Sequence, residues 1–379
     1  MDFTVLKANA NITLDQYDNW QISNIIRFVK KGINYSNGRT CYYILKYPIF
    51  YNNIWYYSVK IKGAGFYDKN KEVIRPGLSD FVRKEPHYGF DKNGNAVQVF
   101  SDIAPFGGIT ESKAANEYNN FEYLSRKGIS TLIPYKLLKY DKLTYRSENL
   151  AVVVALCTEK HPIRLYKLLW PDKSNSEEES VYYASILEKE GIIGNIKSFK
   201  VRSMLIKRIA EKYALEVKKF SESGMYIHSG GWSNIQYNSQ TNNVVLVDLD
   251  SSRRISNECL KFKELYSIRD LISNIYRLLI SLYNPNIILQ YNEKILRENN
   301  YVYYLLSGYF TSIEEKELRK ISNDIMNYYI ANCFNEIKNI ELKMNTMTQK
   351  ESEKYELKMF EFYDFCLRKI QEITIKSKM

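Results

Sequence analysis

The chain has 379 residues, of which 45% are hydrophobic and 26% charged, and its formal net charge is +11. This composition excludes a mainly disordered chain, and the length predicts more than one domain. The positive charge suits a phosphate-rich ligand or an acidic partner. The lysines are nevertheless spread along the chain and mixed with glutamates, so solvated helix faces are the simpler explanation.

Several classes of protein are disfavoured by what the sequence lacks. No apolar run of about 18 residues predicts a membrane span, and no nucleic-acid-binding motif is apparent. The first residues do not follow the basic-then-apolar pattern of a signal peptide. The five cysteines lack metal-ligand or redox spacing, which favours reduced thiols and a cytoplasmic protein. They are Cys41, Cys157, Cys259, Cys333 and Cys366.

Strand signals dominate the N-terminal part. The segment 38–63 contains two of them, and its second half, 54–62, alternates and is rich in aromatic residues. A polar stretch with glycine and proline, 66–106, follows and is interpreted as an insertion. Residues 112–127 predict a helix, because apolar residues recur on one stripe and Gly128 ends the pattern.

Helix signals dominate the remainder. After a buried strand at 150–156, the sequence predicts a polar linker at 171–179 that ends in a solvated acidic run, 177–179. Helices at 198–223 and 265–282 and a Lys- and Glu-rich helical end follow. The expected fold is therefore α+β and protein-kinase-like, with a small β-rich N-terminal lobe and a larger helical C-terminal lobe. The predicted domains are residues 1–160, 161–311 and a helical extension, 312–379.

A polar loop and an acidic strand end predict a metal site. Asn234 lies in a loop, and Asp248 ends the apolar strand 244–247 that follows a turn. An amide oxygen and a carboxylate brought together would suit a hard cation such as Mg²⁺ or Mn²⁺. An ordinary β-hairpin is the alternative interpretation of the same segment.

A kinase-like nucleotide site also needs a strand lysine paired with a helix acid. Lys62 ends a strand and Glu117 lies on the next helix, whereas a surface lysine and a solvated glutamate are the plain alternatives. Lys60 and Lys113 compete with Lys62 for the phosphate-binding role. Gly38 and Arg39 precede the strands and give only a weak phosphate-loop signal, since no GxGxxG or P-loop lysine motif is present.

The loop after the helix at 198–223 departs from a kinase catalytic loop. His228 occupies the place of the structural histidine, but Gly230 stands where a kinase has the aspartate that acts as its catalytic base. His228 is predicted to be a packed, hydrogen-bonded loop residue. Asp270 is predicted either to hold the backbone of this loop or to be an acid near a helix N-terminus, where the helix dipole favours negative charge.

Four segments together resemble the selenoprotein O family of kinase-fold protein adenylyltransferases. They are Val59–Gly65, Gly107 with Glu117-Tyr118 and Gly128–Thr131, His161–Arg164, and Gly224–Ile235 with Val247-Asp248. The resemblance is distant and covers roughly residues 32–282. It implies an inverted ATP, so that the α-phosphate faces an acceptor hydroxyl and AMP is transferred to a protein.

The resemblance implies a role for each matched residue. Lys62 would contact the ATP phosphates, Glu117 would orient Lys62, and Arg164 would lie near the phosphates. Asn234 and Asp248 would hold the metal, and Gly38 and Arg39 would lie at the nucleotide. Lys113 is predicted to bind the nucleotide because it could point into the same cleft as Lys62, not because of the resemblance. Ser233 stands where the family has an aspartate, a departure that argues against base catalysis and favours an inactive pseudoenzyme.

Three functions remain open from the sequence. The first is ATP-dependent AMP transfer to a protein acceptor. The second is a protein or small-molecule kinase that uses the same cleft, and the third is an inactive ATP-binding pseudokinase that serves as an interaction module. The missing aspartates at 230 and 233 favour the third somewhat.

Overall fold

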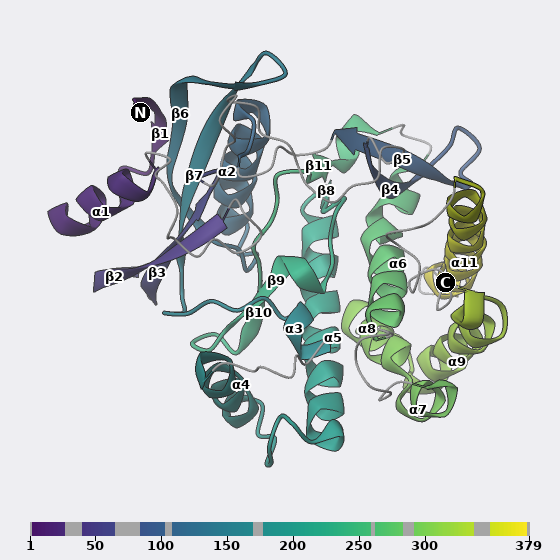
Figure 1. Cartoon of the computed structure of the whole chain (residues 1–379). Helices are drawn as coiled ribbons and strands as arrows, with labels where there is room; N and C mark the ends of the chain where they lie inside the picture. Colours follow the sequence, from purple (N-terminus) through teal and green to yellow (C-terminus); the bar gives the residue numbers. More distant parts are fainter. Residues whose placement is uncertain are drawn as a thin grey trace. The chain divides into compact units, whose positions relative to one another are not determined.

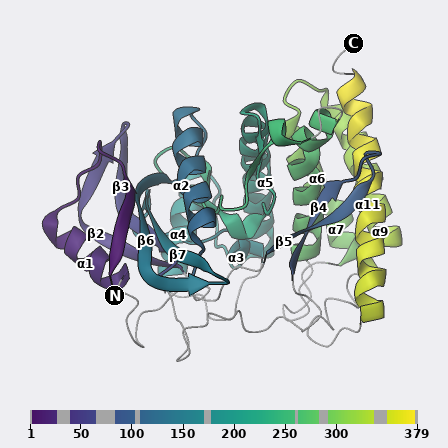
Figure 2. The same ribbon diagram turned by 90° about the horizontal axis from the view of Figure 1, so that it is seen from above.

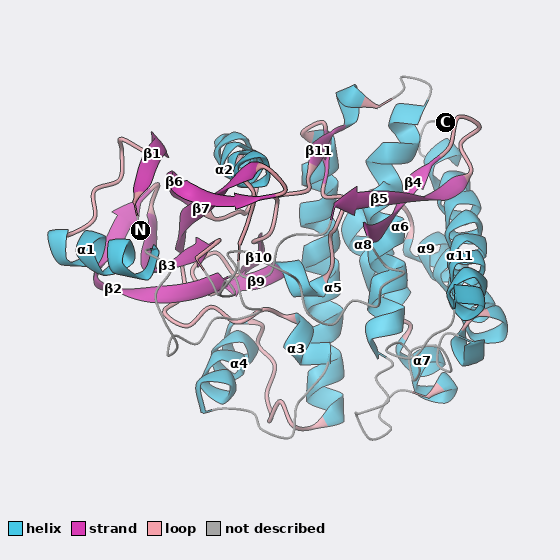
Figure 3. Cartoon of the chain, turned by 45° about the horizontal axis from the view of Figure 1, so that its top comes forward, coloured by secondary structure: helices cyan, strands magenta, loops and turns pink. Residues whose placement is uncertain are grey.

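A computed structural model of the chain describes residues 2–26, 40–64, 84–102, 108–169, 177–258, 262–282, 292–336 and 349–376. The chain forms two compact units, each assembled from segments far apart in the sequence. The first unit contains residues 1–85, 102–163 and 236–252, and the second contains 86–101, 164–235 and 253–379. The predicted α+β fold, with a β-rich N-terminal part and a larger helical part, is confirmed (Figure 3).

The first unit is built on a five-stranded antiparallel sheet of order β1-β6-β7-β3-β2 (Figure 1). Helix α2 packs on β6 and β7, and α1 lies against β2. Most of the hairpin formed by β9 and β10 also belongs to this unit. The elements are β1 (Phe3–Ala8), α1 (Gln16–Ile26), β2 (Thr40–Tyr51), β3 (Ile54–Lys62), α2 (Glu111–Arg126), β6 (Ile133–Tyr145), β7 (Glu148–Cys157), β9 (Ile235–Asn238) and β10 (Asn243–Leu246).

Both faces of this sheet are covered, and strand alternation assigns the residues to them. On β7, Val152 and Val154 belong to the larger core, which includes residues of α1. Ala151 and Val153 face the other way and pack with Ala114 and its neighbours on α2. A strand that is apolar on both faces explains why 150–156 reads as a continuous hydrophobic run.

The second unit is mostly helical. Helix α11 packs against α6 and α9, and α5 packs against α8 and α6 (Figure 2). Its helices are α3 (Tyr166–Leu169), α4 (Glu177–Lys189), α5 (Phe199–Glu222), α6 (Lys263–Leu282), α7 (Glu293–Asn299), α8 (Tyr301–Tyr309), α9 (Glu315–Asn332) and α11 (Gln349–Lys376), with 3₁₀ turns at Trp232–Asn234 and Ile255–Asn257. Short strands β8 (Met225–Tyr226) and β11 (Arg253–Arg254) pair with each other. Among the described residues, no helix is long and apolar enough to cross a membrane.

Part of the predicted insertion forms a hairpin, β4 (Lys84–Phe90) and β5 (Ala96–Asp102). Most of this hairpin belongs to the second unit, where the Tyr88 ring contacts Tyr363 of α11 and the Ala96 amide donates to Asp364. Residues 65–83 and 103–107 lie outside the described residues. The insertion therefore contributes, at least in this hairpin, to the packing of the helical unit.

The predicted linker at 171–179 is wrong at its C-terminal end. Helix α4 begins at Glu177, so the acidic run forms its first turn, where negative charge favours the helix dipole. Glu179 is buried and bonds to Lys167 instead of facing solvent. Residues 171–176 lie outside the described part of the chain.

Candidate functional site

The two lysines of β3 both point away from the main core. Val59 and Ile61 belong to the apolar core beneath the sheet, so the alternation of the strand turns Lys60 and Lys62 to the opposite face, towards α2. Each lysine is only 1% exposed. Charged groups at this depth need ionic and hydrogen-bonding partners, because otherwise their desolvation is not compensated.

Glu117 of α2 is the partner that the two lysines share. Its Oε1 accepts from Lys60 Nζ at 2.9 Å, and its Oε2 lies 2.5 Å from Lys62 Nζ. The Glu117 side chain is completely buried. The helix acid and the strand lysine selected from the sequence are thus brought together, with Lys60 as a second cation on the same carboxylate.

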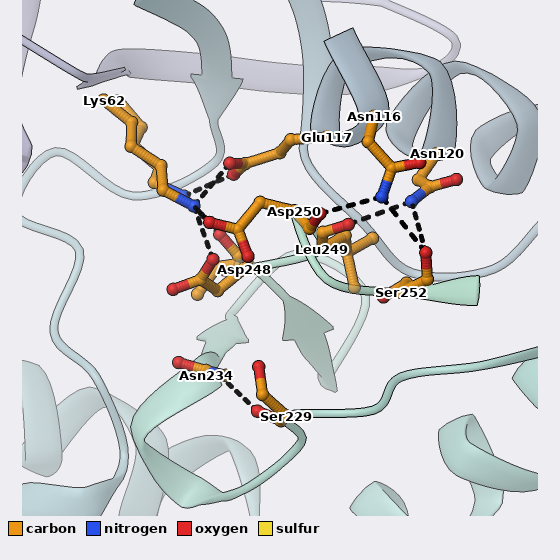
Figure 4. Close-up of polar contacts among 12 residues, drawn as sticks. Lys62, Asn116, Glu117, Asn120, Ser229, Asn234, Asp248, Leu249, Asp250 and Ser252 are labelled. Carbon is orange, nitrogen blue, oxygen red and sulfur yellow. Dashed lines mark hydrogen bonds and ion pairs between the residues drawn. The ribbon is translucent and has the colours of Figure 1, made fainter. Parts of the chain in front are cut away.

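Two aspartates from the loop after β10 complete the cluster. Lys62 Nζ lies 2.6 Å from Asp248 Oδ1 and 2.9 Å from Asp250 Oδ2 (Figure 4). We call Lys60, Lys62, Glu117, Asp248 and Asp250 the lysine–carboxylate centre. It holds three carboxylates against two ammonium groups, so the carboxylates are in excess by one. One oxygen from each carboxylate lies within 4.8 Å of the others.

Helix α2 also clamps the backbone of the aspartate loop. Asn116 Nδ2 donates to the Asp250 carbonyl at 2.8 Å, and Asn120 Nδ2 donates to the Leu249 carbonyl at 2.9 Å (Figure 4). Both amides also reach the Ser252 carbonyl. Asparagines four residues apart lie on one helix face, so a single helix positions both the glutamate and the loop that carries the aspartates.

A glycine fixes the end of the lysine strand. Gly63 follows Lys62 with φ +105°, and a Cβ atom there would lie 2.2 Å from the Ala151 carbonyl oxygen of β7. Only glycine fits this close approach and this backbone conformation. The glycine therefore lets β3 end tightly against β7 directly after Lys62.

Asn234 and Arg164 belong to the second unit and contact each other there. Arg164 Nη1 donates to Asn234 Oδ1 at 3.1 Å and to the Ser233 carbonyl at 2.7 Å, while Asn234 Nδ2 donates to the Ser229 carbonyl at 2.7 Å. The positive charge of the Arg164 guanidinium at this amide oxygen would repel a metal ion bound to the same oxygen. Because Asp248 belongs to the first unit, its predicted pairing with Asn234 stays a prediction.

The loop around His228 is held by two charged residues of α6. Asp270 accepts from the Ile227 backbone amide and bonds to Arg269 Nη1 at 2.7 Å, and Arg269 Nη2 donates to the His228 carbonyl at 3.0 Å. Burial raises the pKa of the Asp270 carboxyl, although Arg269 opposes this shift. Asp270 lies well inside α6, so its predicted contact with the loop is confirmed and the helix-start alternative is not.

His228 is packed and hydrogen-bonded as predicted, with the hydrogen bond made by its backbone carbonyl. It is buried with φ +70°, and the centre of its ring lies 4.2 Å from the centre of the His87 ring. Among the described residues, neither ring nitrogen of His228 has a hydrogen-bonding partner. Burial, followed by the nearby Arg269, lowers the pKa of His228 well below its ordinary value, so the ring is neutral.

Three further residues, Gly38, Arg39 and Lys113, are predicted to bind the nucleotide. Lys113 lies on α2, one helical turn before Glu117, and is partly exposed. Gly38 and Arg39 lie outside the described residues. Their contacts with a nucleotide therefore stay predictions.

Sequence reasoning missed Asp250, Asn116 and Asn120, and it treated Lys60 only as a competitor of Lys62. The spacing of two on β3 placed both lysines on one face, which could have suggested that they act together. The i, i+4 spacing of the two asparagines was also visible. What they hold was not visible, because the contact of Asn120 spans 129 positions in the chain.

No family model matches the chain, and no curated protein matches it in sequence. The resemblance to selenoprotein O therefore stays a prediction from short motifs. Similar solved structures include WaaP in complex with acyl carrier protein, which is 10% identical with a TM-score of 0.38 and covers 89% of this chain and 99% of that one.

Two further similar structures were found. A Toxoplasma gondii specific rhoptry antigen kinase domain is 9% identical with a TM-score of 0.32, over 82% of this chain and 93% of that one. Aerobactin synthetase IucC from a hypervirulent pathotype of Klebsiella pneumoniae is 12% identical with a TM-score of 0.33, over 60% and 48%. These scores are too low to support a conclusion on function.

Proposed function

We propose that this chain is a kinase-fold, ATP-dependent transferase whose nucleotide site is the lysine–carboxylate centre. The observation that carries the proposal is the buried Lys62, which bonds to Glu117 of the neighbouring helix and to two aspartates of the loop after β10. Kinase-like enzymes use this combination: a sheet lysine aligned by a helix glutamate, next to a metal-binding aspartate.

The carboxylates of the centre fit a divalent cation. Three of them lie close together and outnumber the two ammonium groups, and hard cations prefer carboxylate oxygens. Asp248 and Asp250 would hold Mg²⁺ or Mn²⁺, which would supply neutralisation of triphosphate charge. Coordination by Asn234 is a further proposal, carried only by the resemblance.

The other residues of the centre would position and neutralise the triphosphate. Glu117 would hold the Lys62 side chain extended until the triphosphate binds, and the Lys62 ammonium would then turn from the carboxylates to the phosphate oxygens. The bonds from Asn116 and Asn120 would hold the aspartate loop still while the charges rearrange. Preorganised charges of this kind, rather than a covalent intermediate, would supply most of the rate.

The finer proposal is transfer of AMP to a protein side chain, as the resemblance to selenoprotein O implies. The acceptor oxygen would form a bond to the α-phosphorus, the bond to the β-phosphate oxygen would break, and pyrophosphate would leave. In the alternative, the acceptor attacks the γ-phosphorus and ADP leaves. Lys62 and the aspartates serve either reaction, so their geometry does not choose between them.

An inactive ATP-binding protein is the other candidate. Gly230 stands where a kinase has its base, and Ser233 stands where the resembled family has an aspartate. In that case ATP would bind at the lysine–carboxylate centre without transfer to any acceptor, and the chain would act as an interaction module.

One labelling experiment separates these functions. The protein is incubated, either alone or together with a protein extract, with Mg²⁺ and ATP. The ATP carries its label at either the α or the γ phosphate. We expect the α label to enter protein. Entry of the γ label alone would establish phosphoryl transfer, and binding without any incorporation would support the inactive alternative. If ATP does not bind, the proposal is wrong.

A further inference from the structure

We propose that Lys60 is a positioning residue that anchors Glu117, so that Lys62 can leave the carboxylates and bind the triphosphate. This inference rests on the proposed function and adds a second lysine to it. A single lysine would have to orient the glutamate and contact phosphate at once. Here the two tasks are divided between two positions of the same strand.

The contacts of Lys60 tie it to the scaffold. Its Nζ donates to Glu117 Oε1 at 2.9 Å and to the backbone carbonyl of Val247, directly before Asp248. The same ammonium lies 5.8 Å from the centre of the Phe121 ring, one turn further along α2. Lys60 therefore links β3, α2 and the start of the aspartate loop.

The contacts of Lys62 are of a different kind. Its ammonium is shared among the carboxylates of Glu117, Asp248 and Asp250, the two last of which are slightly exposed. These are the groups that a metal and a triphosphate would engage. Binding of ATP would thus draw Lys62 away from part of its present partners.

Glu117 could not tolerate that movement without Lys60. Its carboxylate is fully buried, and a buried charge that loses its only counter-ion is strongly destabilised. Because Lys60 holds the other oxygen of Glu117, the glutamate stays paired while Lys62 moves. Without Lys60, Glu117 would retain Lys62 and hold it back from the phosphates.

A stability cycle tests the pairing independently of catalysis. The thermal midpoints of the wild type, Lys60→Met, Glu117→Gln and the double variant are compared. We expect Lys60→Met to lower the midpoint in the wild type. In the Glu117→Gln background, where Lys60 has lost its carboxylate, the same change should be neutral or stabilising. An equal decrease in both backgrounds would overturn the proposed anchoring.

The same cycle in ATP-dependent transfer tests the positioning role. We expect Lys60→Met to reduce kcat/KM by about tenfold to a hundredfold, with a raised KM for ATP, because small displacements of a phosphate-binding group have effects of this size. In the Glu117→Gln background the same change should cause no further loss. Lys60→Arg, which keeps the positive charge, should recover part of the rate.

Val59→Ala is the matched control, since Val59 precedes Lys60 on β3 but faces the apolar core. It should lower the midpoint and leave kcat/KM within about twofold of the wild type when assayed well below that midpoint. If Lys60→Met behaves like Val59→Ala, Lys60 is merely structural. If the wild type is active but the losses from Lys60→Met and Glu117→Gln add up in the double variant, only the role of Lys60 is refuted. If the wild type neither binds ATP nor transfers label, both proposals are refuted.

Discussion

Asp248 lies where β10 ends and the aspartate loop begins. It shares Lys62 with Asp250 and Glu117, and it is the first carboxylate after the strand. In the proposed site, Asp248 and Asp250 together would balance a divalent cation. A cation bound by too few anionic ligands is held weakly and out of position.

We therefore expect Asp248→Ala to reduce transfer from ATP by orders of magnitude, as measured by incorporation of label. Glu188→Ala, which removes an exposed glutamate of α4, is the control for loss of one negative charge. Full transfer by Asp248→Ala would show that the metal ligands have been assigned wrongly.

His228 makes stability depend on pH. Because its pKa is lowered in the folded protein, the unfolded chain takes up a proton first as the pH falls below about 6.5. The free energy of unfolding should then decrease by up to about 1.4 kcal/mol for each pH unit. The raised pKa of Asp270 acts in the opposite direction, since the folded protein then binds the proton more readily.

His228→Asn isolates this contribution, because asparagine tolerates the left-handed backbone at 228. We expect this variant to be less stable at neutral pH but to lose less stability between pH 7 and pH 5.5 than the wild type. Urea unfolding at several pH values measures both slopes. Parallel slopes would mean that the His228 ring does not resist protonation in the folded state.

Helix α2 is the element that assembles the candidate site. Its buried face presents Glu117 to the lysines and Asn116 and Asn120 to the aspartate loop, while Tyr118 and Ala114 pack against the sheet. A displacement of this helix would move the glutamate and the loop together. The site is therefore sensitive to bonds that touch neither lysine.

Asn120→Ala tests this dependence against Asn119→Ala, the adjacent and exposed asparagine. Loss of the Asn120 amide leaves the buried Leu249 carbonyl without that bond, which costs about 1–3 kcal/mol. We expect a lower thermal midpoint and weaker ATP binding for Asn120→Ala, and almost no change for Asn119→Ala. Equal behaviour of the two variants would show that the Asn120 side chain of α2 does not hold the aspartate loop.

Local pattern predicted the elements better than their connections. The alternation on β3 and the apolar stripe on α2 identified the strand and the helix. The kinase-like pairing of a strand lysine with a helix acid then selected Lys62 and Glu117. Asp250 follows the end of β10, where alternation no longer applies. Its contact with Lys62 spans 188 positions and depends on the folded path of the chain.

The acidic start of α4 shows a second limit of pattern reading. Glu177, Glu178 and Glu179 read as a solvated run because their charges lie together in the sequence. The same charges suit a helix N-terminus, and only the fold shows that Glu179 turns towards Lys167.

At the scale of the whole molecule, the net charge of +11 is not evidence for nucleic-acid binding. Many surface cations pair with acids on their own helices, as Arg126 does with Glu122 and Arg319 with Glu315. Such pairs reduce the local positive potential that a phosphate backbone would need.

We expect the protein not to retard random-sequence DNA or RNA in a gel at about 0.15 M salt. A set of salt concentrations provides the control, because weak electrostatic binding should vanish as salt rises. A retarded complex whose affinity falls steeply over several salt concentrations would instead indicate a phosphate-binding surface of many cations.

The central claim is that Lys62 and its carboxylates form an ATP site, and calorimetric titration of ATP into the protein with Mg²⁺ tests it most directly. We expect saturable binding by the wild type and by Lys142→Met, which alters an exposed lysine of β6. Lys62→Met, checked by circular dichroism to be folded, should bind at least tenfold more weakly, which corresponds to about 1.4 kcal/mol. Absence of binding by the wild type, or equal affinity in folded Lys62→Met, would contradict the account.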